Sequence, residues 1–194
     1  NDEVSGLRTA LAMGADRALL VSDPAFLGTD ALTTAKVIAA CVRRAGAVDL
    51  VLTATESSDG YTGTVPAQVA ELLGWPSLTF SKQVQLADGM ATVQRQTEAG
   101  FDVVRAPLPA VVSVTAGVVE PRYPSFKGIM AAKSKPVDAC TAADLGLDAV
   151  GWAGARQQIT NVSAAPARQA GEKVEDDGTG YERVVAYLES LKLV

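Results

Sequence analysis

The segment from Val48 to Pro76 constrains the fold of this 194-residue chain more than any other. In order, it reads as a short apolar strand, a loop of small polar residues and the start of a helix. The strand residues Val48, Leu50, Val51 and Leu52 are typical of a parallel-sheet strand covered on both faces. A helix that follows so closely on a strand predicts an α/β unit with a loop at the carboxyl edge of the sheet.

The loop of this unit is suited to binding an anion. It comprises Ala54, Thr55, Glu56, Ser57, Ser58, Asp59, Gly60, Tyr61, Thr62, Gly63, Thr64 and Val65. Two glycines allow close backbone approach, the hydroxyls add donors, and the next helix directs unpaired N–H groups and its positive dipole end at the loop. The loop matches neither the Walker A nor the GxGxxG pattern. An ordinary polar strand–helix connection is the alternative, because turns and N-caps use the same residues.

A second segment combines aromatic and basic residues after an apolar strand at 110–114. It comprises Glu120, Pro121, Arg122, Tyr123, Pro124, Ser125, Phe126, Lys127, Gly128, Ile129 and Met130. The two prolines exclude regular ladder pairing, so we expect a stiff, exposed loop with an aromatic tip and a basic surround. Such a loop is suited to docking an acidic partner through one buried anchor. The alternative is that Phe126 and Met130 pack into the core.

Composition narrows the classes of function. The net charge of −5 argues against nucleic acid as the main partner, and 48% hydrophobic residues can form one sizeable core. The chain has no histidine, which makes hydrolase triads and zinc sites improbable. Its apolar runs are too short to cross a membrane, and we expect no signal peptide. Cys41 and Cys140 form no CxxC motif, which favours a reducing compartment.

Hydrophobic periodicity predicts alternating helices and strands in the first part of the chain. We expect a helix over 7–15, a strand over 17–21 and a helix from an N-cap at Asp30 to about Arg44. The buried face of that second helix is predicted to contain Leu32, Ala35, Ile38 and Val42. This order predicts a mainly parallel, Rossmann-like α/β sheet with right-handed connections.

The pattern changes after Pro76. Alternating apolar residues between Val84 and Val104, broken at 87–89 and 98–100, predict an antiparallel ribbon. Periodicity fades over 147–180, so we expect an extended arm that wraps a partner subunit, followed by an amphipathic helix. The predicted organisation is an α/β domain with the anion-binding loop at 1–146 and an arm with its terminal helix at 147–194. Asp176 and Asp177 in this arm read as a solvated turn and not as an acid–base pair.

Ordered sequence landmarks identify a family. The chain resembles the β subunit of electron transfer flavoprotein from Leu7 to its end. The landmarks are ALAMGADRALLV at 10–21, DLVL with the Ser-Ser-Asp-Gly loop at 49–60, LPAVVSV at 108–114, EPRYPSFKGIMAAK at 120–133, DLG at 144–146 and AGEKV at 170–174. EPRYPSFKGIM is the most specific of them.

The resemblance implies an electron carrier and not an enzyme. In this family the β subunit pairs with an α subunit that holds most of the FAD contacts, and it usually binds AMP as a structural ligand. Carried over to this chain, the nucleotide loop is 54–65 and the dehydrogenase-recognition loop is 120–130, with Phe126 at the anchor position where many relatives have leucine. Electrons are expected to come from acyl-CoA or related dehydrogenases and to pass to a membrane quinone reductase. The expected location is the bacterial cytoplasm, or the mitochondrial matrix in a eukaryote.

Several alternatives stay open. Relatives that bifurcate electrons bind a second FAD in place of AMP; they often carry an acidic residue where this chain has Tyr61, which favours AMP. A universal-stress-type nucleotide sensor would share the loop but would not account for EPRYPSFKGIM, and an adenosine-nucleotide hydrolase would need an acid, base or metal set. We also expect that the family's N-terminal portion, with its first strand and loop, is absent from this chain.

Overall fold

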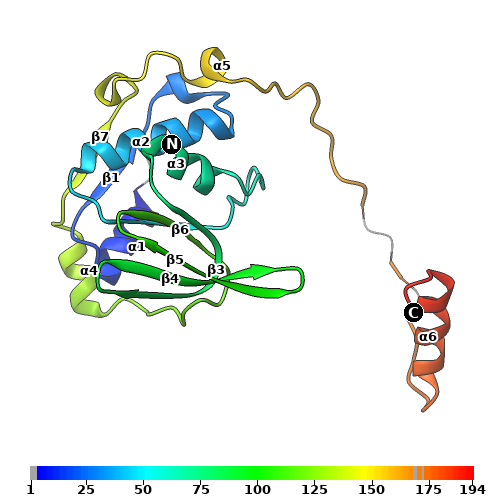
Figure 1. Ribbon diagram of the computed structural model, residues 1–194. Coiled ribbons are helices and arrows are strands. Elements are labelled where there is room, and N and C mark those ends of the chain that lie inside the picture. Colours follow the sequence, from blue (N-terminus) through cyan, green and yellow to red (C-terminus); the bar gives the residue numbers. More distant parts are fainter. Residues whose placement is uncertain (1–3, 168–169, 172) are drawn as a thin grey trace. The chain divides into compact units, whose positions relative to one another are not determined.

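A computed structural model describes residues 4–167, 170–171 and 173–194 of the chain (Figure 1). Glu172, within the AGEKV landmark, lies outside the described residues. The chain divides into two units, Asn1–Gln158 and Ile159–Val194. The first unit contains the helices α1 Ser5–Met13, η1 Pro24–Phe26, α2 Ala31–Ala45, α3 Val65–Leu73, α4 Phe126–Ala132, η2 Ala143–Leu145 and α5 Gly151–Gly154.

Seven strands of the first unit form two sheets. They are β1 Ala18–Val21, β2 Leu50–Ala54, β3 Ser77–Ala87, β4 Met90–Thr97, β5 Gly100–Pro107, β6 Ala110–Val114 and β7 Val137–Cys140. One sheet pairs β1 with β7, and the other has the order β2-β6-β3-β4-β5. The pairs β1–β7, β2–β6 and β3–β6 are parallel, whereas β3–β4 and β4–β5 are antiparallel. The predicted α/β fold with an antiparallel extension is confirmed.

Strand β6 is covered on both faces. Val111 packs with Ala35, Val69 and Ala70, so α2 and α3 lie side by side on one face of the sheet (Figure 1). The neighbouring Val112 belongs to a second core cluster with residues of the antiparallel ribbon on the opposite face. That cluster consists of Leu78, Ala91, Val93, Ala110 and Val112.

Strand β2 differs from the prediction of a strand covered on both faces. It pairs only with β6 and stands at the edge of its sheet, and Leu52 is 60% exposed. A strand is buried on both faces when it lies in the interior of its sheet, and an apolar run alone does not ensure that position. In this sheet β6 is an interior strand, between β2 and β3. Leu32 is also exposed and not on the buried face of α2, because it lies in the first turn of that helix at its open end.

Local signals account for several helix and turn boundaries. The Asp30 carboxylate accepts a hydrogen bond from the Thr33 N–H at 2.8 Å and so caps α2. The hairpin between β3 and β4 turns at Asp88 and Gly89, both with positive φ, as a two-residue type I′ turn requires. Several short elements were missed, among them α4 and α5, which span only 7 and 4 residues, too few to show a helical period.

The second unit contains α6 Gly180–Ser190, which confirms the predicted terminal helix. Asp176 and Asp177 accept hydrogen bonds from the backbone N–H groups of Gly178 and Thr179 in the turn before it. The predicted solvated turn is therefore confirmed. Taken by itself, this unit leaves Tyr181, Val184 and Tyr187 exposed on α6.

Helices α1 and α4 make a close contact at Gly128. A Cβ built on Gly128 would lie 2.4 Å from the backbone oxygen of Ala12, which is far too close. Gly128→Ala is therefore expected to lower the free energy of unfolding by about 1–3 kcal/mol, although alanine favours helix. Urea unfolding measures this change. The control is Gly6→Ala in α1, where a Cβ meets nothing within 4 Å and the expected change is a gain of up to about 1 kcal/mol. Equal effects of the two substitutions would contradict this packing.

Candidate functional site

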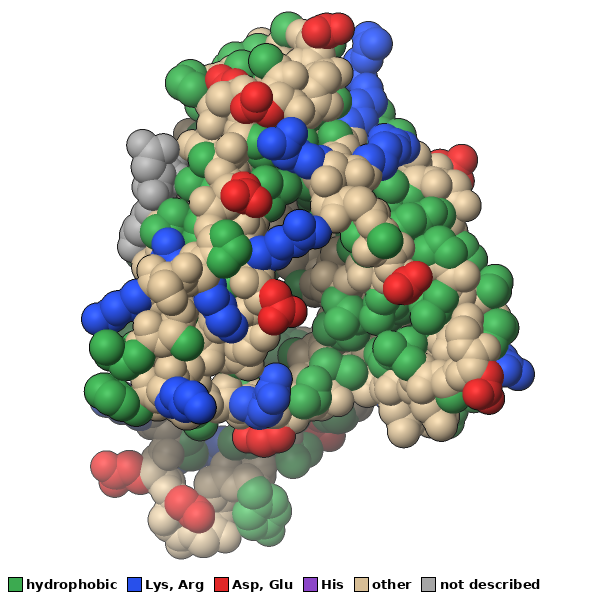
Figure 2. All heavy atoms as spheres, turned by 90° about the vertical axis from the view of Figure 1, so that its left-hand side faces the viewer, with side chains coloured by type: hydrophobic (Ala, Val, Ile, Leu, Met, Phe, Trp, Pro, Cys, Tyr) green, Lys and Arg blue, Asp and Glu red, His purple; other side chains and the backbone are tan. Residues whose placement is uncertain are grey.

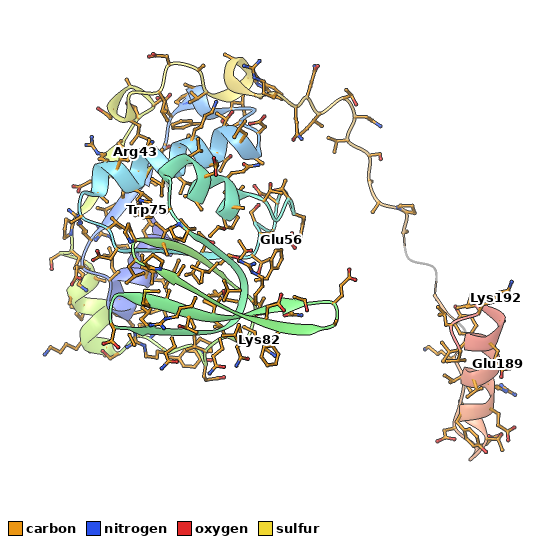
Figure 3. All side chains as sticks on the ribbon, in the orientation of Figure 1. Arg43, Glu56, Trp75, Lys82, Glu189 and Lys192 are labelled. Atoms are coloured by element: carbon orange, nitrogen blue, oxygen red, sulfur yellow. The ribbon has the colours of Figure 1, made fainter. Side chains whose placement is uncertain are left out.

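The loop at 54–65 connects the end of β2 to the start of α3, as predicted (Figure 3, where Glu56 is labelled). Its first part is tied to the sheet, because the Thr55 hydroxyl donates to the Val114 carbonyl at 3.1 Å. A local turn follows, in which the Tyr61 N–H donates to the Ser57 carbonyl at 3.1 Å. Hydrogen bonds from the Ser57 hydroxyl and from backbone N–H groups hold the pKa of Asp59 below its usual range. The loop thus has a defined shape while most of its residues stay exposed.

The loop reaches α3 through two residues with positive φ. Tyr61 has φ 47° and Gly63 has φ 63°, a conformation that glycine adopts at low cost and tyrosine adopts rarely. The Thr64 side chain makes no capping hydrogen bond to α3, and Pro66 in the first turn has no N–H. The first turn of α3 is therefore not capped from within the loop. Its remaining N–H groups and its dipole are available to an anion.

A cavity of about 480 Å³ lies in front of the N-termini of α2 and α3. It is lined by Asp30, Ala31, Leu32, Thr62, Thr64, Gln68, Arg156 and Gln157. Of the twelve predicted loop residues, only Thr62 and Thr64 line it. Gln68 and Arg156 were not predicted. Gln68 lies one helical turn after Thr64, a spacing that could have indicated it, whereas no local signal connects Arg156 with this loop.

The Asp30 carboxylate lines this cavity and accepts hydrogen bonds from the backbone. Asp30 accepts hydrogen bonds from the N–H of Arg156 at 2.7 Å and from the N–H of Thr33 at 2.8 Å, one on each oxygen. These two bonds hold the pKa of Asp30 below its usual range. Asp30 is therefore ionised at neutral pH and joins the chain at 156 to the start of α2.

The segment at 120–130 forms a capped helix and not only a loop. Residues 120–125 lack regular structure, as the prolines predict, but α4 begins at Phe126. The Ser125 hydroxyl caps α4 by accepting a hydrogen bond from the Gly128 N–H at 3.0 Å. Tyr123 is 94% and Phe126 is 80% exposed, and Met130 is half exposed. The alternative that Phe126 and Met130 pack into the core is wrong for this chain.

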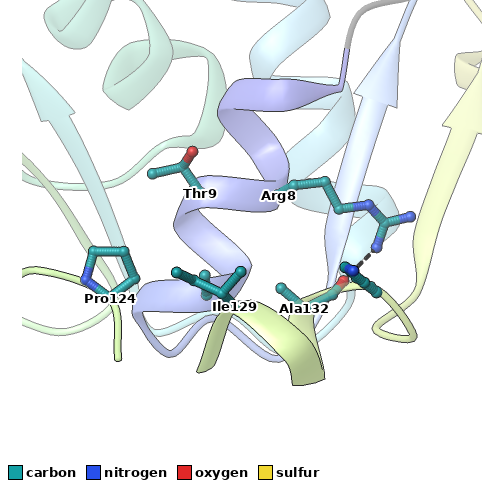
Figure 4. A pocket seen from close by; sticks show the side chains of 7 residues that line it. Arg8, Thr9, Pro124, Ile129 and Ala132 are labelled. Carbon is teal, nitrogen blue, oxygen red and sulfur yellow. Dashed lines mark hydrogen bonds between the residues drawn. The ribbon is translucent and has the colours of Figure 1, made fainter. Parts of the chain in front are cut away.

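A network of side-chain to backbone bonds fixes α4 against α1. Arg8 donates to the carbonyl of Ala132 (Figure 4) and to that of Lys135, each at 2.7 Å. Lys135 donates in return to the carbonyls of Leu11 and Ala15, at 3.0 and 2.6 Å. Between the helices lies a cavity of about 530 Å³, with Arg8, Thr9, Pro124 and Ile129 among its lining residues. Figure 2 faces this side of the molecule and shows several Lys and Arg side chains beside apolar ones.

The part of the chain that the structure describes shows neither a metal-ion site nor a membrane span. There, no three His, Cys, Asp or Glu residues are grouped so that they could hold a metal ion. No helix among the described residues is both long and apolar enough to cross a membrane. Cys140 is buried and Cys41 half-buried, and both are free thiols.

Comparison with known proteins identifies the family. Residues 1–145 match the electron transfer flavoprotein domain. The electron transfer flavoprotein subunit beta of Mycobacterium bovis is 42% identical over 190 residues, which cover 97% of this chain and 71% of that protein. The chain belongs to the electron transfer flavoprotein family. Its mycobacterial relatives are named as beta subunits, which confirms the resemblance inferred from the sequence landmarks.

Two further relatives are less similar to this chain. The electron transfer flavoprotein subunit beta of Syntrophomonas wolfei is 38% identical over 174 residues, covering 90% of this chain and 65% of that protein. The caffeyl-CoA reductase-Etf complex subunit CarD of Acetobacterium woodii is 36% identical over 186 residues, covering 95% and 70%. One of the relatives is thus named as a subunit of a reductase-Etf complex.

The bonds at Asp30 predict a pH-dependent stability. Because its folded-state pKa is lowered, the stabilisation by Asp30 is present above its unfolded pKa and is lost as pH falls through the folded value. Asp30→Ala is expected to lower the free energy of unfolding by about 1 kcal/mol at pH 7. The difference from the parent protein should shrink as pH falls below about 4. Urea unfolding between pH 7 and pH 3 measures it, with Asp102→Ala on exposed β5 as control. A difference independent of pH would contradict this role.

Proposed function

We propose that this chain is the β subunit of a heterodimeric electron transfer flavoprotein. It accepts electrons from acyl-CoA or related dehydrogenases and passes them to a membrane quinone reductase, together with an α subunit that holds most contacts to FAD. It acts as a carrier and has no catalytic residues of its own. Membership of the family carries this proposal, because the β-subunit relatives match 97% of the chain.

The loop at 54–65 is proposed to bind AMP as a structural ligand. Support comes from the open N-terminus of α3, the positive φ of Gly63 and the hydroxyls of Thr62 and Thr64 at one cavity. A phosphate placed there receives backbone and hydroxyl donors, as at other helix N-termini. We propose that the nucleotide is a ligand and not a substrate, because the loop offers backbone and hydroxyl donors to one phosphate.

A second FAD in place of AMP is the competing assignment. The similarity to a caffeyl-CoA reductase-Etf complex subunit makes it worth testing. Tyr61 favours AMP, because relatives with a second FAD often carry an acidic residue at this position. Mass spectrometry of the nucleotide released from the denatured heterodimer distinguishes the two: AMP supports the proposal, and two FAD per heterodimer would replace it.

Gly63→Val is expected to remove the nucleotide from the purified heterodimer while the α-bound flavin stays. Gly63 has φ 63°, which valine adopts only under strain, and its side chain would enter the loop. The matched control is Gly74→Val at the other end of α3, where φ is 71° and a Cβ meets nothing within 4 Å. Both variants strain the backbone, but only Gly63→Val should lose AMP, measured per flavin after denaturation. AMP retained in Gly63→Val would place the phosphate elsewhere.

The segment at 120–130 is proposed to dock dehydrogenases through Phe126. Support comes from its 80% exposed ring on a capped helix beside Lys127 and Lys133. An apolar anchor within a basic surround fits an acidic surface that contains one apolar pocket.

Phe126→Asp should weaken this docking by about 2 kcal/mol, roughly thirtyfold in affinity, with unchanged flavin content. The measurement is the rate of flavin reduction by a dehydrogenase as a function of carrier concentration, where the half-saturating concentration should rise. Phe101→Asp on β5 is the control, because it removes another exposed aromatic ring. Equal behaviour of both variants would assign Phe126 to ordinary surface.

A further inference from the structure

The cavity in front of α3 is lined by a cationic side chain, Arg156, which lies far from the loop in the sequence. Arg156 follows α5, and its main chain is fixed by the bond from its N–H to Asp30 at 2.7 Å. The preceding turn is fixed as well, because the Thr33 hydroxyl donates to the Gly154 carbonyl at 3.1 Å. The residue that carries this guanidinium is therefore anchored to the same helix end that borders the cavity.

The Arg156 guanidinium has no partner among the described residues. The only bond of Arg156 to Asp30 uses its backbone N–H, and both Asp30 oxygens are already engaged by backbone donors. A guanidinium offers five donors in a planar fork that matches phosphate oxygens. At a cavity beside the uncapped start of α3, the complementary ligand is an anion with several oxygens.

Gln68 adds an independent indication of a ligand. Its Oε1 is buried and has no hydrogen-bond partner among the described residues, while its Nε2 donates to the Thr64 hydroxyl at 3.3 Å. Buried polar atoms are normally satisfied, and Gln68 is among the residues that line the same cavity as Arg156.

We propose that Arg156 and Gln68 are nucleotide-binding residues of this subunit. The Arg156 guanidinium binds the phosphate of a nucleoside monophosphate together with the Thr62 and Thr64 hydroxyls. The Gln68 amide binds a hydroxyl or amino group of the nucleoside, and Leu32, exposed at the cavity, provides an apolar contact for the base. This inference rests on the proposed nucleotide function and extends it to residues outside the 54–65 loop.

The test uses the heterodimer with its flavin bound and its AMP removed, and titrates it with AMP and with adenosine by calorimetry. Arg156→Gln should weaken AMP binding at least about tenfold and leave adenosine binding unchanged, because only the phosphate contact is lost. Arg156→Lys should be intermediate, since it keeps the charge but not the planar fork. Gln68→Leu should weaken both ligands. Arg105→Gln removes an exposed arginine on β5 and should bind both ligands like the parent.

The outcomes separate this inference from the proposed function. If Gly63→Val loses AMP but Arg156→Gln and Gln68→Leu bind it like the parent, the nucleotide site is correct. The assignment of Arg156 and Gln68 to that site is then wrong. If Gly63→Val also binds AMP normally, the proposed nucleotide site itself fails. Should the Arg156→Gln heterodimer lose its flavin, the Arg156→Lys variant decides. Weaker AMP binding with unchanged adenosine binding supports the inference, and unchanged AMP binding overturns it.

Discussion

Burial of β6 on both faces is the constraint on which the rest of the first unit depends. Ala110, Val111 and Val112 are fully buried, with Val111 against the helices α2 and α3 and the other two in the cluster of the antiparallel ribbon. Each residue removed from water adds to stability in proportion to its apolar area. One five-residue strand thus joins the helical layer to the ribbon. It also fixes the carboxyl edge where the loop at 54–65 begins, through the bond from Thr55 to Val114.

Much of this architecture could be predicted from local patterns. The cap at Asp30, the hairpin at Asp88 and the helix after Thr64 each depend on residues within a few positions of one another. Residues that are close in the sequence determine such features. The fold class and the family followed from them together with the longer landmarks.

What could not be predicted depends on contacts between distant segments. The edge position of β2 depends on which strands pair with it, and an apolar run such as Leu50–Leu52 does not contain that information. Likewise, Arg156 reaches the loop cavity only because its N–H bonds to Asp30, 126 residues earlier. The helix at Phe126 was too short for a period, although Ser125 supplied an N-cap signal that could have revealed it.

The Ser125 cap has a consequence for how the exposed ring of Phe126 is presented. Two prolines precede the cap, and Arg8 and Lys135 fasten α4 to α1, so this surface is ordered before any partner arrives. A preorganised surface loses little conformational entropy on binding. As the proposed anchor, Phe126 would permit recognition without a large interface, and small interfaces separate quickly. The geometry of α4 therefore suits a protein that must leave one partner as readily as it meets the next.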